Sequence, residues 1–261
     1  MSKDQGGFIW YELMTPDISA ARAFYQAVLG WSVPEAGHPP VDYREIVAPD
    51  GGMVGGMLPL SPEMLSGGAK PGWYGYICVD DVDVQLAELK EAGGTVFMDQ
   101  TMPDVGRIAM VADPQGVPVY LMKPQPPAGM ENAKSTAFDP GSEGHVAWNE
   151  LMTPDPAAAK DWYLDRFGWT IAGAMPMGDM GDYEFLNRED QAIGAMMKAP
   201  EGRPATWGFY WNVADIDAAK TRIETAGGTI VDGPHEVPGG QFVIQALDPQ
   251  GVAFGLVGAR N

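Results

Sequence analysis

Apolar residues in the first part of the chain form two successive patterns, a continuous run and then a regular spacing. The run FIWYELM, residues 8–14, is typical of a buried strand, and apolar residues then recur every three or four positions through residues 18–29. The second pattern predicts an amphipathic helix. Asp17 and Gly30 flank this segment, at positions where a capping oxygen and a left-handed residue are favoured. Short apolar runs between residues 43 and 58, separated by Pro-Asp-Gly-Gly, predict further strands.

The same order of elements starts again further along the chain. WYGYICV at residues 73–79 is strand-like, Asp80 or Asp81 can cap a helix through residues 82–92, and three strand-like runs follow between residues 95 and 122. The second half of the chain repeats both patterns. The implied unit is β-α-β-β-β, present four times. It predicts an α+β fold with helices on the convex face of strongly curved, barrel-like mixed sheets.

The two halves of the chain are copies of each other. ELMTPD at residues 12–17 recurs at 150–155, and DPQGV at residues 113–117 recurs at 248–252. Other shared positions keep their order, among them Trp73 with Trp207 and Asp42-Tyr43 with Asp182-Tyr183. We therefore predict a first repeat at residues 1–123, a Pro- and Gly-rich linker at 124–143 and a second repeat at 144–261, with two modules in each repeat.

The order of these motifs resembles a known protein family. A strand ending in T-P-D, a helix ending in F-Y-x-x-V-L-G-W, a later A-G-G and D-P-x-G-x-x-x-x-L are similar to the vicinal oxygen chelate superfamily, which includes glyoxalase I, bleomycin-resistance proteins and extradiol dioxygenases. Within it, the chain resembles the two-repeat bacterial members represented by the mycobacterial 27 kDa antigen. The resemblance implies βαβββ modules that form an open barrel with a ligand on its concave face. It leaves the chemistry open, because the superfamily hosts unrelated activities on one scaffold.

The resemblance also implies four positions at which metal-dependent members carry His, Gln or Glu. Transferred by motif register, these positions fall on Trp10, Gly56, Tyr74 and Tyr120 in the first repeat and on Trp148, Ala195, Gly208 and Gly255 in the second. None of these residues can bind a divalent ion as the family does. We therefore expect a protein without a divalent metal or another cofactor.

Glu12 and Glu150 are the acids of the repeated strand, two residues after Trp10 and Trp148. Strand alternation puts each Glu on the same face as its Trp, where an unpaired carboxylate would be costly to bury. Each Glu is either a pocket group, acting as a base or as a metal ligand in a shifted register, or a structural part of the repeated motif. A metal site needs more ligands than one carboxylate. We expect the three histidines not to supply them and to be solvated loop side chains: His38, His145 and His235.

If the metal positions are apolar, the concave face becomes an aromatic and Met-rich pocket. We expect its lining to be Trp10, Glu12, Met57, Tyr74, Tyr76 and Tyr120 on one side and Trp148, Glu150, Met196, Trp207, Phe209 and Trp211 on the other. Such a pocket suits a small apolar, aromatic or cationic ligand. The alternative is that these aromatic side chains fill a collapsed barrel core.

Composition narrows the class of partner. The chain has 261 residues, of which 45% are hydrophobic and 20% are charged, and its formal net charge is −19. Such an acidic surface repels nucleic acid and anionic lipid. The single cysteine, Cys78, excludes a disulfide within the chain. The N-terminus has no signal-like apolar segment, and no run approaches the ~20 apolar residues of a membrane span. We expect a cytoplasmic protein with no membrane partner.

Three functions remain open. The first, which we favour, is a metal-independent small-molecule binding protein of the glyoxalase/bleomycin-resistance type. The second is an enzyme, a glyoxalase-like lyase or a dioxygenase, that uses Glu12 or Glu150 as a base or metal ligand. The third is a scaffold protein with filled barrels. The sites form either within one repeat or between repeats, with module one beside module four and module two beside module three. The chain would then be an internal pseudo-dimer, as a monomer or in a homodimer.

Overall fold

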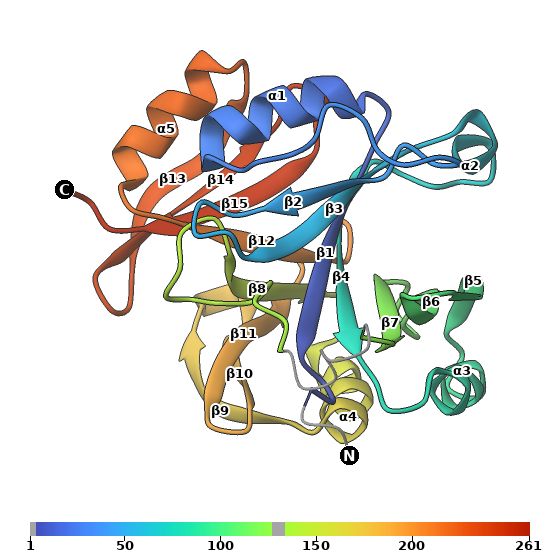
Figure 1. Cartoon of the computed structure of the whole chain (residues 1–261). Coiled ribbons are helices and arrows are strands. Elements are labelled where there is room, and N and C mark those ends of the chain that lie inside the picture. The colour runs from blue at the N-terminus through green and yellow to red at the C-terminus, as the bar shows by residue number, and fades with distance from the viewer. Residues whose placement is uncertain (1–3, 127–133) are drawn as a thin grey trace. The chain divides into compact units, whose positions relative to one another are not determined.

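The computed structural model describes residues 4–126 and 134–261 (Figure 1). The first repeat contains β1 (Phe8–Thr15), α1 (Ile18–Leu29), β2 (Arg44–Val47), β3 (Met53–Pro59), α2 (Pro62–Ser66), β4 (Gly72–Cys78), α3 (Val82–Glu91), β5 (Thr95–Met102), β6 (Gly106–Ala112) and β7 (Pro118–Pro124). The second repeat contains β8 (Val146–Thr153), α4 (Pro156–Phe167), β9 (Trp169–Pro176), the 3-10 helix η1 (Gly178–Met180), β10 (Asp182–Arg188), β11 (Gln191–Lys198), β12 (Thr206–Val213), α5 (Ile216–Thr225), β13 (Thr229–Val237), β14 (Gln241–Leu247) and β15 (Ala253–Gly258). In the described part of the chain, no helix has the length and apolar character needed to cross a membrane.

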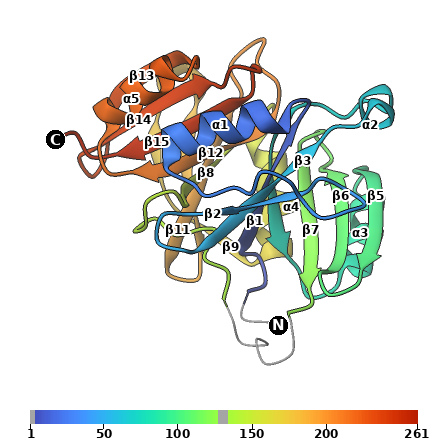
Figure 2. The same ribbon diagram turned by 45° about the horizontal axis from the view of Figure 1, so that its top comes forward.

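The strands form two open mixed sheets, which together with the helices confirm the predicted α+β class. The strand orders are β2-β3-β1-β4-β7-β6-β5 and β13-β14-β15-β12-β8-β11-β10-β9. In each module the first strand pairs in parallel with the last, as β1 does with β3 and β8 with β11. The other strand pairs within a module are antiparallel hairpins. Helix α3 packs on strands β5, β6 and β7 of its own module (Figure 2).

The first module has one strand fewer than the sequence predicts. Modules two to four show the βαβββ order, whereas α1 is followed only by β2 and β3 among the described residues. In the third module, β9 runs antiparallel to β10. The corresponding residues 32–40 form isolated bridges instead, one of them between His38 and Tyr43. The stretch VPEAGHPP contains three prolines, and a prolyl nitrogen has no N–H to give to a strand ladder.

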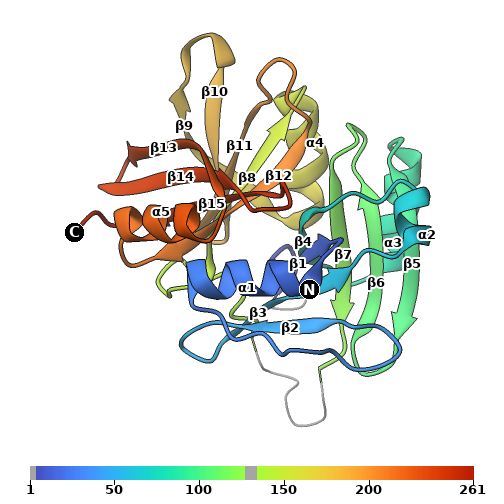
Figure 3. The ribbon, with the colours of Figure 1, turned by 90° about the horizontal axis from the view of Figure 1, so that it is seen from above.

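The chain divides into two compact units, each of which takes segments from both repeats. Unit 1 comprises the described residues of 1–9, 75–134 and 149–207, and unit 2 comprises 10–74, 135–148 and 208–261. Unit 1 thus combines the second and third modules, and unit 2 combines the first and fourth, as in the between-repeat alternative. In unit 2, helices α1 and α5 lie side by side (Figure 3).

The duplicated motifs tie the repeats together inside each unit. In unit 2, the side-chain oxygen of Gln250 accepts hydrogen bonds from Thr15 Oγ1 (2.9 Å) and the Asp17 N–H (3.0 Å), and its Nε2 donates to the Asp17 carbonyl (2.9 Å). In unit 1, Gln115 makes the same three bonds with the turn at residues 153–155. The Gln of D-P-Q-G in one repeat therefore holds the T-P-D turn of the other, which gives both motifs a structural role.

A buried chain of Trp, Tyr and Asp crosses between repeats in each unit. In unit 2, Trp73 Nε1 donates to Tyr25 Oη at 3.0 Å, and the Tyr25 hydroxyl donates to Asp248 Oδ2 at 3.3 Å. Burial, followed by the charge of the Asp, raises the pKa of the Tyr25 phenol well above its usual value. The corresponding chain in unit 1 consists of Trp207, Tyr163 and Asp113. These chains satisfy polar atoms inside aromatic cores, where an unpaired donor or acceptor would be costly.

Candidate functional site

A hydrogen-bonded chain lies on one face of strand β1 in unit 2. Trp10 and Glu12 share this face because they are two residues apart on a strand. The Trp10 Nε1–H donates to Tyr43 Oη at 2.7 Å, and the Tyr43 hydroxyl is hydrogen-bonded to the carboxylate of Glu12. Glu12 is only 4% exposed. A buried carboxylate is thus held by a phenol, which in turn accepts from an indole.

Two phenols near Glu12 remain protonated at neutral pH. Burial, followed by the charge of Glu12, raises the pKa of Tyr43 well above its usual value. The same two causes, in the same order, raise the pKa of Tyr74. A phenol with a raised pKa is a hydrogen-bond donor and not a base at neutral pH. Glu12 is therefore the group on this face of β1 that can take a proton or bind a positive charge.

Tyr43 fits against the sheet because residue 56 is a glycine. Glu12 is paired with Gly56 on β3, and Gly56 is paired with Glu45 on β2. A Cβ atom at residue 56 would lie 2.1 Å from Tyr43 Oη, so any side chain there would clash with the phenol. The glycine therefore makes room for the phenol, and Glu45 lies at the same level of the sheet as Glu12.

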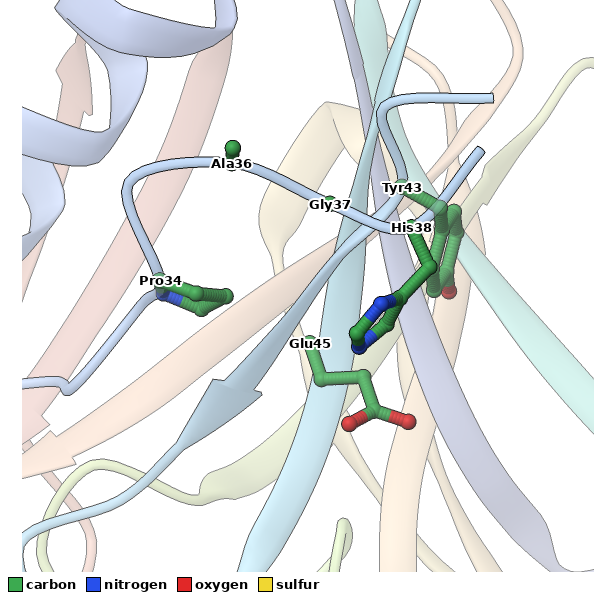
Figure 4. A pocket seen from close by; sticks show the side chains of 6 residues that line it. All are labelled: Pro34, Ala36, Gly37, His38, Tyr43 and Glu45. Carbon is green, nitrogen blue, oxygen red and sulfur yellow. The ribbon is translucent and has the colours of Figure 1, made fainter. Parts of the chain in front are cut away.

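A pocket of about 190 Å³ lies beside Tyr43 (Figure 4). Its lining residues come from β2 and from the loop that takes the place of the missing strand: Pro34, Ala36, Gly37, His38, Tyr43 and Glu45. The imidazole of His38 lies next to the side chain of Glu45 and to the ring of Tyr43 (Figure 4). The pocket therefore combines an acid, an imidazole and an aromatic ring next to the buried chain.

Unit 1 contains a corresponding carboxylate–phenol pair. The Tyr183 hydroxyl donates to Glu150 Oε2 at 2.9 Å, and Glu150 is 7% exposed. Glu150 is paired with Ala195, and Ala195 with Phe185. Phe185 therefore occupies the position that Glu45 has in the first repeat, and its ring lies 5.8 Å from that of Tyr183. An aromatic ring, and not a second acid, flanks the pair in the second repeat.

The sequence pointed to Glu12 and Glu150 but not to the tyrosines that hold them. The match of Asp42-Tyr43 with Asp182-Tyr183 was visible in the comparison of the two repeats. An Asp-Tyr pair whose tyrosine follows the repeated Glu by 31 residues in the first copy and by 33 in the second was the signal that could have identified this partner.

Five of the expected lining residues lie in the packed cores. Met57 and Met196 are completely buried and are paired with leucines of β1 and β8, so by strand alternation they face away from Glu12 and Glu150. The other three pack against aromatic residues of β1: Trp207, Phe209 and Trp211. For these five side chains the structure shows the packing that the core alternative describes.

Three tyrosines among the expected lining residues are buried as well, and one tryptophan is partly buried. In unit 1, Tyr76 and Tyr120 are paired neighbours on β4 and β7, and their rings stack with centroids 4.0 Å apart. In unit 2, Trp148 is partly buried and packs against the cluster that contains Tyr210. Tyr74, also in unit 2, donates a hydrogen bond to the Lys70 carbonyl at 2.9 Å.

One of the three histidines contradicts the expectation of a solvated loop side chain. His145 is completely buried; its Nε2 lies 3.0 Å from Asp50 Oδ1, and its Nδ1 contacts the Thr136 carbonyl. The expectation was wrong because the linker residues beside it fold back, with Thr136 Oγ1 donating to the carbonyl of Met53 on β3. His38 and His235 are exposed.

The residues at the metal positions implied by the resemblance do not fit a divalent ion. Trp10 and Gly56 frame Tyr43, and Tyr120 stacks on Tyr76, whereas such ions take His, Cys or carboxylate ligands or several oxygens. Among residues 4–126 and 134–261, no group of three or more His, Cys, Asp or Glu side chains could hold a metal ion.

Comparison with known proteins finds the same family in both repeats. The model of the Glyoxalase/Bleomycin resistance protein/Dioxygenase superfamily matches residues 7–121 and 143–256. The "Putative glyoxylase CFP32" of Mycobacterium bovis is 31% identical over 266 residues, which cover 97% of this chain and 95% of that protein. The "Anthracycline biosynthesis protein DnrV" of Streptomyces peucetius is 28% identical, with 98% of this chain and 94% of that protein covered.

Solved structures of dioxygenases share the fold. Homoprotocatechuate 2,3-dioxygenase from Arthrobacter globiformis superposes with a TM-score of 0.68 at 17% identity, covering 98% of this chain and 80% of that chain. An extradiol ring-cleaving dioxygenase from B. fuscum gives a TM-score of 0.67 at 15% identity, covering 98% and 73%. At these identities the likeness concerns the fold and not the chemistry.

Proposed function

Because this chain belongs to the glyoxalase/bleomycin resistance protein/dioxygenase superfamily, we propose that it binds a small organic ligand and does so without a divalent metal. The hydrogen-bonded chain of Trp10, Tyr43 and Glu12 beside a pocket carries this proposal. Ligand sites usually combine apolar walls with a few polar groups that converge on the ligand. Glu12 and Glu150 are the polar anchors, and aromatic rings provide the walls.

The side chains around Glu12 support a binding site that is organised before the ligand arrives. The indole of Trp10 fixes the phenol of Tyr43, and the phenol fixes the carboxylate. Side chains already held in place lose less conformational freedom on binding, which improves affinity. A buried carboxylate attracts a ligand that carries a positive charge or a hydrogen-bond donor.

The residues that stand at the family's metal-ligand positions support binding without a metal. At the positions where the resemblance implies a chelating set, the first repeat has Trp10, Gly56, Tyr74 and Tyr120. The phenol of Tyr43 lies over Gly56, which is one of these positions. A ligand would therefore contact the aromatic rings and the carboxylate directly.

A metal-free lyase is a second candidate, favoured by the contact between Tyr43 and Glu12. A protonated phenol and a carboxylate side by side can serve as general acid and general base. The relatives named glyoxylases point in the same direction. Turnover of a hemithioacetal by chelator-treated protein, lost in Glu12→Gln, would establish this activity.

A thermal-shift screen of chelator-treated protein tests the binding function. Small apolar, aromatic and cationic molecules are the probes, since a ligand at about 100 times its Kd stabilises the folded state by about 2.7 kcal/mol. We expect stabilising compounds whose effect is lost in Tyr43→Phe and Glu12→Gln. The proposal is wrong if no compound stabilises the protein. It is also wrong if every stabilising compound raises the stability of both variants as much as that of the unsubstituted protein.

A further inference from the structure

The first repeat has a pocket wall that the second repeat builds differently. In the third module, strand β9 runs along the edge of β10. In the first module, the Pro-rich residues 32–40 leave the edge of β2 and form the wall that carries His38. The opposite wall carries Glu45, at the position where the second repeat has Phe185. The two copies therefore differ at the same place in the fold, because the first repeat has the loop at residues 32–40 and the carboxylate of Glu45.

The charges around this pocket are negative. Glu45 lines it, and the charges of Glu12 and Glu45 both act on the phenol of Tyr43. The nearest basic side chain on the same strand is turned away: Arg44 is paired with Met57 and therefore faces the other side of the sheet. Its guanidinium lies 2.7 Å from Asp42 Oδ2, so its charge is already neutralised.

Size and lining restrict what can enter. A volume of about 190 Å³ corresponds to about six water molecules at liquid density, which fits a small amine or one arm of a larger ligand. The ring of Tyr43 can receive an ammonium group on its face, and Glu45 can pair with its charge. An anionic group would be repelled by the Glu45 carboxylate.

We propose that the pocket between Glu45, His38 and Tyr43 binds the ammonium group of a small amine, and that this preference belongs to the first repeat alone. The inference rests on the proposed small-molecule binding function and names the ligand class for one of its two sites. The second repeat, with Phe185 in place of Glu45, lacks the pairing charge.

An NMR titration with three ring compounds of equal size tests this inference. Benzylamine, benzyl alcohol and benzoate share a phenyl ring and differ in charge. We expect benzylamine to shift the amide resonances of Gly37 and Glu45 and to bind about fivefold more tightly than benzyl alcohol, as suits one partly exposed charge pair. Benzoate should bind more weakly than either.

Two Glu→Gln substitutions, which each remove one negative charge, test whether the preference for benzylamine depends on Glu45. Glu45→Gln should reduce benzylamine affinity to that of benzyl alcohol and leave the alcohol unchanged. Glu35→Gln is the matched control, because Glu35 lies in the same loop with its side chain 89% exposed and is not among the pocket residues. It should change neither affinity.

The other outcomes separate this inference from the function on which it rests. Equal affinities for benzylamine and benzyl alcohol at Gly37 and Glu45 would overturn the amine preference and leave small-molecule binding intact. Benzylamine shifts of equal size at Tyr183 and Phe185 would overturn the restriction to the first repeat. No shift with any of the three compounds at millimolar concentration would overturn the pocket itself and count against binding by the first repeat.

Discussion

At the scale of the residue, Tyr43 decides what Glu12 can do. The position of Glu12 on a strand, with Trp10 on the same face, allowed us to predict from the sequence a buried acid in need of a partner. The partner itself could not be predicted, because it depends on how β2 packs across β3 and on the space left by Gly56. Such a contact depends on tertiary packing and not on local periodicity.

Removing the Tyr43 hydroxyl should cost both stability and binding. In Tyr43→Phe, the Trp10 N–H loses its acceptor and Glu12 loses a donor, so we expect the free energy of unfolding to fall by about 1–3 kcal/mol. Urea denaturation measures this change. Tyr183→Phe, which removes the bond to Glu150, is the matched variant and should cost a similar amount. An unchanged stability in Tyr43→Phe would show that the hydroxyl is not part of a buried network.

At the scale of the element, helix ends were predictable and contacts between distant segments were not. Asp17 caps α1 by accepting hydrogen bonds from the Ser19 and Ala20 N–H groups, and Gly30 ends it with a φ of 71°, as its sequence position indicates. The strand absent after α1 follows from prolines that the sequence displays, whereas the other three modules have a strand at that place. The role of Gln250 depended on a turn 233 residues away.

Loss of one Gln contact should destabilise one unit. Gln250→Ala removes the two hydrogen bonds that its side-chain oxygen accepts and the one that its Nε2 donates at the turn of Thr15 and Asp17, and we expect a loss of about 1–3 kcal/mol in the free energy of unfolding. Gln115→Ala should cost the same. The effects should add in the double variant within about 0.5 kcal/mol, because the two side chains share no partner. Strong non-additivity in denaturation experiments would contradict two separate contacts.

The buried acids should make stability depend on pH in a direction that can be stated. Burial raises the pKa of Asp248 above its usual value of 3.8, so the folded state favours the protonated form. The stability that Asp248 contributes through its protonated form is fully present below pH 3.8. It is lost as the pH rises through the raised pKa of the folded state. Asp248→Asn removes it. The stability of the variant relative to the unsubstituted protein should therefore increase as the pH rises from below 3.8. A relative decrease over that range would contradict the direction.

At the scale of the whole molecule, the duplication is a means of completing each unit. The sequence showed two repeats and four modules, and the matched family covers both copies. It could not show that modules one and four share one unit and modules two and three the other, because every repeat carries the same motifs and both pairings satisfy them. Hydrogen bonds such as that from Tyr25 to Asp248 identify the pairing that forms.

A single repeat should not fold as a stable monomer. Residues 1–123 alone lack Asp248 and Gln250, so Tyr25 and the turn at Thr15 lose their partners. We expect this fragment to be unfolded, or to form a dimer in which its own Asp113 and Gln115 replace them, as measured by analytical ultracentrifugation and circular dichroism. Co-expression with residues 144–261 should restore a folded heterodimer. A folded monomer of the first repeat would contradict the pairing between repeats.

We propose that this member of the superfamily binds its ligand without a metal. The test is elemental analysis of protein produced with added Ni, Zn, Fe and Mn, followed by titration of the strongest compound from the thermal-shift screen before and after treatment with a chelator. We predict a metal content far below one ion per chain and the same affinity in both titrations. One or two ions per chain, with binding abolished by the chelator, would contradict the account and would make Glu12 and Glu150 metal ligands.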